Sequence, residues 1–138
     1  MQISLSRADQ ESLIAFLQDL VRIPSPSTQE ERVARRIVDE MRRVGFDEIR
    51  VDRIGNVVGR LGNVDGPILL YNGHMDTVNI TDPALWQSDP YGADIRDGVL
   101  YGLGAADPGL VTRRGRGRRP GPKGRSDGRN DATPSKVW

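Results

Sequence analysis

A short apolar run that leads into the only histidine of the chain constrains the fold more than any other feature. Residues 67–71 read Pro-Ile-Leu-Leu-Tyr, and apolar residues at successive positions are typical of a strand buried on both faces, hence central in a sheet. His74 follows this run, and Asp76 lies two positions further on, so that in extended backbone both side chains leave on the same side. A carboxylate beside an imidazole is typical of a metal-bound histidine. The alternative is a histidine at a strand end without a ligand.

The residues before this run predict two helices. Apolar residues recur at helical spacing over residues 9–22, where prolines end the pattern. A second apolar stripe follows Thr28 and Glu31, which are spaced as in a capping box, and Gly45 is placed to end that helix.

The remaining segments predict strands. Residues 49–51 have strand-like alternation, residues 56–61 predict a second strand entered through Gly55, and residues 95–101 read as a hairpin around an Arg-Asp-Gly turn. Helices followed by strands, one of them apolar on both faces, predict a layered α/β fold. Sites in such folds gather beyond the carboxyl ends of strands, which is where His74 lies.

The charge of the chain is divided unevenly. Residues 111–138 carry nine lysines and arginines against two aspartates, a net charge of +7, whereas the whole chain is +1 and residues 1–110 are therefore −6. The basic part is rich in arginine, glycine and proline and has little to bury, so we expect it to be a disordered tail. We place a boundary near Leu110, with residues 1–110 as the folded body.

The composition also limits the chemistry. The chain has no cysteine, so disulfides and thiolate metal sites are excluded and any metal must be held by histidine and carboxylates. Its 138 residues make one domain at most. We see neither a secretory signal nor an apolar stretch of membrane-spanning length, and we therefore expect a cytoplasmic location without a membrane partner.

A second chemical signal lies at residues 101–107, where glycines and alanines lead to Asp107. Small residues let the backbone pass close to a neighbour, which suits a loop that delivers this carboxylate to a confined site. The alternative is a flexible glycine turn followed by a solvated aspartate. A phosphate-binding loop is disfavoured, because neither G-x-G-x-x-G nor a lysine-serine ending is present.

Taken together, these segments resemble the aminoacylase, carboxypeptidase G, acetylornithine deacetylase and succinyl-diaminopimelate desuccinylase family of metallohydrolases. The resemblance covers nearly all of residues 9–107. It is carried by residues 20–25 with Glu30 and Glu31, residues 55–57, residues 73–78, Trp86 with Asp89 and Pro90, and residues 98–104 leading to Asp107.

The resemblance implies an N-terminal part of a layered α/β/α catalytic domain in a zinc-peptidase-like fold. It implies two zinc ions, with cobalt as a substitute, of which one is bound by His74 and both are bridged by Asp107. Asp76 is implied to act in catalysis by holding His74. The implied reaction is hydrolysis of an amide bond in a small peptide or an N-acyl amino acid, and members of the family are often homodimers. Peptide, N-acetyl, N-succinyl and N-carbamoyl substrates all stay open.

The sequence departs from the family after Asp107. Family members continue with a lysine-glycine-glycine helix start and later supply a glutamate pair, another carboxylate and a second histidine, none of which follows here. We therefore expect this chain to be truncated and inactive, its basic end arising from a shifted reading frame or a truncated gene. The alternative is a non-catalytic α/β module with a basic nucleic-acid-binding arm. We disfavour nucleic acid as a partner because Trp138 is the only aromatic residue in the tail.

Overall fold

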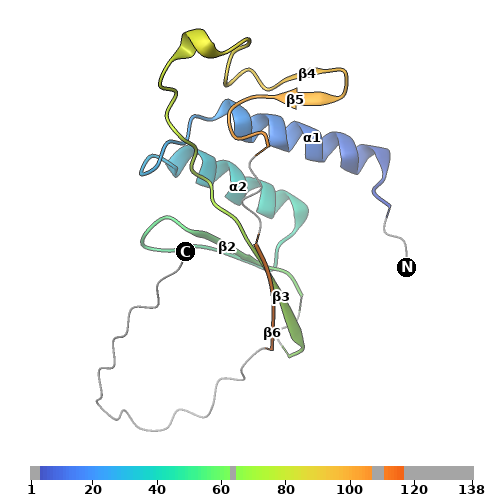
Figure 1. The fold of residues 1–138 in the computed structure, drawn as a ribbon. Coiled ribbons are helices and arrows are strands. Elements are labelled where there is room, and N and C mark those ends of the chain that lie inside the picture. Colours follow the sequence, from blue (N-terminus) through green and yellow to red (C-terminus); the bar gives the residue numbers. More distant parts are fainter. Residues whose placement is uncertain (1–3, 63–64, 107–110, 117–138) are drawn as a thin grey trace.

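The computed structural model describes residues 4–62, 65–106 and 111–116 (Figure 1). Two helices come first, and short strands and one 3₁₀ turn follow. The elements are α1 (Arg7–Arg22), α2 (Glu31–Val44), β1 (Glu48–Val51), β2 (Val57–Arg60), β3 (Pro67–Asn72), η1 (Pro83–Leu85), β4 (Asp94–Arg96), β5 (Val99–Tyr101) and β6 (Val111–Arg116). Neither helix is long and apolar enough to cross a membrane, within the part of the chain described.

A capping box fixes the start of α1. The Ser6 hydroxyl accepts a hydrogen bond of 3.1 Å from the amide of Asp9, whose carboxylate accepts one of 3.3 Å from the amide of Ser6. The helix therefore begins at Arg7, two residues before the predicted start at residue 9, and it ends at Arg22 as predicted. The early start follows from the two backbone N–H groups that this box satisfies.

The end of α2 was predicted correctly, but the prediction that Thr28 caps its start was wrong. Gly45 follows the helix with a φ of 84°, the left-handed conformation that glycine adopts without strain. Thr28 does not cap the helix. It has a φ of 74°, its amide donates to the Glu30 carboxylate at 2.8 Å, and the helix begins at Glu31 without a side-chain cap.

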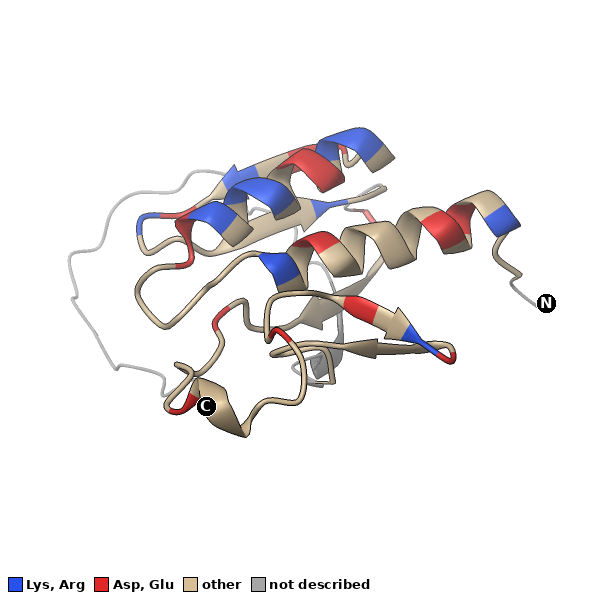
Figure 2. Cartoon of the chain, turned by 90° about the horizontal axis from the view of Figure 1, so that it is seen from above, with Lys and Arg blue, Asp and Glu red and all other residues tan. Residues whose placement is uncertain are grey.

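The two helices share the apolar core of the described residues. The buried apolar side chains on these helices are Val21, Val33, Ala34 and Val38. Figure 2 shows acidic and basic residues interleaved along α2, whereas the basic residues of α1 lie at its two ends. One of the basic residues of α2, Arg36, joins α2 to α1, because its guanidinium donates to Asp19 at 3.0 Å and lies 4.7 Å from the centre of the Phe16 ring.

The described strands form three separate antiparallel pairs, β1 with β2, β3 with β6 and β4 with β5. With the two helices they confirm the predicted mixed α/β class. The predicted hairpin is β4–β5, and its turn residues Asp97 and Gly98 have φ angles of 52° and 77°. Two successive positive φ angles are what a tight type I′ hairpin turn requires.

The environment of β3 differs from the prediction. Its apolar residues predict a central, buried strand, yet every residue of β3 is exposed, including Leu69 at 56% and Tyr71 at 60%. Its only strand partner among the described residues is β6, with Pro67 opposite Arg116. Strand β3 therefore has a main-chain partner without burial of its side chains.

Strand β6 also departs from the expectation for the basic tail, which predicts irregular structure from residue 111 onward. Antiparallel pairing with β3 runs from Val111 to Arg116. Such pairing satisfies main-chain N–H and C=O groups and does not depend on apolar side chains, which is why composition failed to indicate it. Residues 117–138 lie outside the described residues, and the boundary near Leu110 stays a prediction.

Candidate functional site

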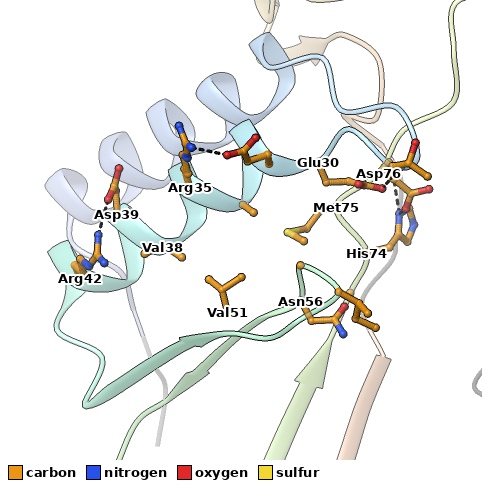
Figure 3. Close-up of a pocket in the computed structure, with 16 residues that line it drawn as sticks. Glu30, Arg35, Val38, Asp39, Arg42, Val51, Asn56, His74, Met75 and Asp76 are labelled. Carbon is orange, nitrogen blue, oxygen red and sulfur yellow. Dashed lines mark hydrogen bonds and ion pairs between the residues drawn. The ribbon is translucent and has the colours of Figure 1, made fainter.

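The segment after β3 is fixed against the loop that joins the two helices. Pro26 and Thr77 form a parallel β-bridge, and the amide of Thr77 donates a hydrogen bond of 2.8 Å to the carbonyl of Ser25. Ser25 is 2% exposed. The loop and the residues just after β3 are therefore held together through their main chains, and the candidate site lies at this junction (Figure 3).

His74 lies two residues beyond the end of β3, as predicted from the sequence. Its Nδ1 atom is 3.0 Å from the main-chain oxygen of Asp76 and 3.3 Å from the carboxylate Oδ1 of the same residue. Both groups accept hydrogen bonds at neutral pH, so the favoured neutral tautomer has its proton on Nδ1 and its lone pair on Nε2. The predicted approach of Asp76 to the imidazole is confirmed.

The other carboxylate oxygen of Asp76 is held by a residue that the sequence did not indicate. The Ser27 hydroxyl donates to Asp76 Oδ2 at 2.6 Å. This bond is the largest reason why the pKa of Asp76 lies below its ordinary value, against an opposing effect of burial. The only sequence signal was the two prolines at positions 24 and 26, which favour extended backbone between the helices.

A groove of about 790 Å³ opens beside this pair, between α2, the β1–β2 turn and residues 73–76 (Figure 3). Ala34, Val38 and Met75 give it apolar lining. Its other lining residues are Thr28, Glu30, Glu31, Arg35, Asp39, Arg42, Val51, Ile54, Gly55, Asn56, Gly73, His74 and Asp76. The volume is in the range of small-molecule sites.

The charged residues of α2 in this groove form pairs. Arg35 is paired with Glu31, and Arg42 lies 3.0 Å from Asp39 (Figure 3). These pairs are largely exposed, so they add little to the free energy of folding. They give the groove both signs of charge beside an apolar floor.

A smaller cavity of about 210 Å³ is lined by His74 and by Leu103 and Gly104, which belong to the loop before Asp107. A Cβ on Gly102 would lie 2.3 Å from the Cγ1 of Val21, so any other residue here would force Val21 or the backbone to shift. The close approach predicted from the small residues is confirmed. Asp107 itself lies outside the described residues, and its convergence with His74 and Asp76 stays a prediction.

The residues described here do not by themselves make a metal centre. No group of three or more histidine and carboxylate side chains is placed to hold an ion within the described part of the chain. A catalytic zinc ordinarily takes three protein ligands, whereas this junction offers one imidazole whose neighbouring carboxylate is engaged by Ser27. The roles predicted for His74, Asp76 and Asp107 in metal binding and catalysis stay predictions.

Comparison with known proteins agrees with the resemblance seen in the sequence. Residues 70–110 match the model of peptidase family M20/M25/M40. The chain is 42% identical over 99 residues to the "Uncharacterized protein YgeY" of Escherichia coli (strain K12), covering 71% of this chain and 24% of that protein. It is 38% identical over 101 residues to the succinyl-diaminopimelate desuccinylase of Rhodospirillum centenum, covering 68% of this chain and 26% of the relative.

The desuccinylase of Cereibacter sphaeroides (strain ATCC 17029) is 40% identical over 97 residues, again 68% of this chain and 26% of the relative. The chain thus spans about a quarter of the length of the curated relatives it matches. Over the part that it shares with them, the chain belongs to peptidase family M20/M25/M40.

Proposed function

We propose that this chain carries part of the metal site of a hydrolase that cleaves amide bonds in small peptides or N-acyl amino acids. The observation that carries the proposal is the contact of His74 Nδ1 with Asp76, which leaves the lone pair of the neutral ring on Nε2. The family match and the relatives named as desuccinylases support the reaction class.

In this proposal His74 would be a ligand of one zinc ion, Asp76 would hold the imidazole in the tautomer that can bind it, and Asp107 would supply a second ligand. Cobalt would bind the same donors. A carboxylate on the far side of a ligating histidine is the ordinary partner in such sites. The sequence after Asp107 contains no glutamate and no histidine, so we expect the 138-residue chain alone to lack turnover.

The direct test is metal binding by the purified chain. Binding of zinc or cobalt is measured by calorimetry or, for cobalt, from its visible spectrum. We expect the chain to bind either metal weakly and the His74→Ala variant to lose this binding. Asn79→Ala removes a polar side chain from the same segment and serves as the control. Equal binding by the chain and by His74→Ala would overturn the proposed ligand.

A chimera tests the reaction. The matching 101 residues of the Rhodospirillum centenum desuccinylase are replaced by those of this chain. We expect the folded chimera to release succinate from the relative's substrate and His74→Ala to abolish this activity. A folded chimera that stays active with alanine at position 74 would contradict the proposal.

A further inference from the structure

We propose that Ser27 is a positioning residue of this site, which fixes the Asp76 carboxylate and through it the tautomer of His74. The inference rests on the proposed function of His74 as a metal ligand. It extends the site to the loop between α1 and α2, to which the sequence motifs assign no role.

The geometry gives each oxygen of Asp76 one side-chain partner. Ser27 donates to Oδ2 at 2.6 Å, while Oδ1 lies 3.3 Å from His74 Nδ1, which is also 3.0 Å from the main-chain oxygen of Asp76. The terminal torsion of an aspartate is broad and does not by itself select one orientation. Because both oxygens belong to one planar group, a bond that fixes Oδ2 also fixes the direction of Oδ1.

Ser27 is held in place by its own backbone rather than by burial of its side chain, which is exposed. The preceding residue, Pro26, forms the bridge to Thr77, directly after Asp76 in the chain. The main-chain bond from Thr77 to Ser25 closes the same junction. Ser27 and Asp76 are therefore each adjacent in sequence to one of the two residues that form the main-chain bridge.

The backbone after Ser27 is strained in a way that agrees with a functional constraint. Thr28 is β-branched and has a φ of 74°, a conformation that such a residue rarely adopts unless its surroundings impose it. The Glu30 carboxylate holds the amide of Thr28 at 2.8 Å. The loop thus keeps a conformation that its own sequence does not favour, at the point where it reaches Asp76.

The test reads the tautomer directly, since the only histidine of the chain gives an unambiguous imidazole signal. We expect ¹⁵N NMR of the full chain, at a pH where the ring is neutral, to show a protonated Nδ1 and an unprotonated Nε2. In Ser27→Ala the Nε2 signal should move toward the protonated form, and Ser27→Thr, which keeps the hydroxyl, should restore it. An unchanged Nε2 signal in Ser27→Ala would overturn the inference.

Ser12→Ala is the matched control, because it also removes one serine hydroxyl from a hydrogen bond, that with Arg43 at 2.7 Å. This bond joins the two helices away from His74, and its loss should leave the tautomer unchanged. Dispersion of the amide spectrum reports the fold of each variant. Ser27→Gly provides a second removal of the hydroxyl should the alanine variant fail to fold.

Zinc titration of the same samples separates this inference from the proposed function. Loss of a group that orients a metal-bound histidine costs about 10–100-fold in metal affinity, and we expect Ser27→Ala to fall at the lower end, about 10-fold. If Ser27→Ala binds zinc through His74 with the same affinity as the unmodified chain, and its His74 has the same tautomer, the positioning role of Ser27 is overturned and the proposed ligand is not. A tautomer that responds to Ser27 in a chain that binds no zinc would support the positioning role and overturn the proposed ligand.

Discussion

The side-chain amide of Gln18, in the C-terminal half of α1, donates a hydrogen bond of 2.8 Å to the carbonyl oxygen of Ala93, just before β4. Ala93 is fully buried and has a φ of 52°. This bond ties the first helix to the hairpin whose following loop lines the cavity beside His74.

Gln18→Ala should therefore lower the free energy of unfolding by about 1–3 kcal/mol, because it leaves a carbonyl without its donor in a partly buried place. Gln10→Ala is the control, since Gln10 makes a similar bond of 3.0 Å to Leu5 in an exposed place and should cost less than about 0.5 kcal/mol. Urea denaturation measures both. Equal losses in the two variants would show that the bond to Ala93 does not hold the hairpin.

Gly102→Ala should destabilise the chain by about 1–3 kcal/mol, because the new methyl group would meet buried Val21 and the main-chain oxygen of Pro90 at 3.2 Å. Gly66→Ala meets no atom within 4 Å and should be neutral or stabilise slightly. Thermal unfolding of the two variants tests this, and a stable Gly102→Ala protein would contradict the close packing of this loop on α1.

Glu40 makes stability depend on pH. Hydrogen bonds from Arg43 and then from Arg36, against an opposing effect of burial, lower the pKa of Glu40 from its ordinary 4.5 to about 2. Above the ordinary value both folded and unfolded chains carry the charge, and the stabilisation is complete. As the pH falls through this range the unfolded chain takes up the proton first, so the stabilisation declines and is lost below about 2.

Glu40→Gln removes this contribution. Its free energy of unfolding should be lower than that of the unmodified chain at neutral pH, and the difference should shrink as the pH falls from 4.5 toward 2. Denaturation with urea at a series of pH values measures it. Two curves that stay parallel over this interval would show that the arginine pairs do not act on Glu40 in solution.

The exposed apolar residues of β3 should cause self-association. Leu69 is 56% exposed, with Ile68, Leu70 and Tyr71 exposed beside it, and such a patch on a strand is an aggregation hazard. Leu69→Lys should reduce association in sedimentation velocity without loss of fold. Leu85→Lys changes an even more exposed leucine, outside the sheets, and should have little effect. Association that persists unchanged in Leu69→Lys would place the contact elsewhere.

The features predicted correctly from the sequence are those with local causes. Helical spacing and Gly45 fixed the second helix end, and the pair Asp97–Gly98 fixed the hairpin turn, because backbone conformation there depends on neighbouring residues. The position of His74 followed from the end of an apolar strand. The contact of Asp76 with His74 followed from their spacing.

The features that the sequence did not predict depend on partners distant in the chain. Ser27 and Asp76 are 49 positions apart in the sequence, and neither segment contains a pattern that indicates their contact. Thr28 has the spacing of a capping residue, but it has a positive φ and lies two residues after Pro26, which forms the bridge to Thr77. The exposure of β3 could not be predicted either, since apolar composition indicates what a strand can bury and not whether a neighbour covers it.

The main-chain bridge between Pro26 and Thr77 has a consequence for the order of folding. Helix α2 and the β1–β2 hairpin lie within the loop that this bridge closes, and their contacts join residues near in sequence. Closing a long loop costs more chain entropy than closing a short one, so contacts of high sequence separation form late. The junction that brings Ser27 to Asp76 should therefore assemble after the helix and the hairpin that lie within its loop, and it should open before them when the chain begins to unfold.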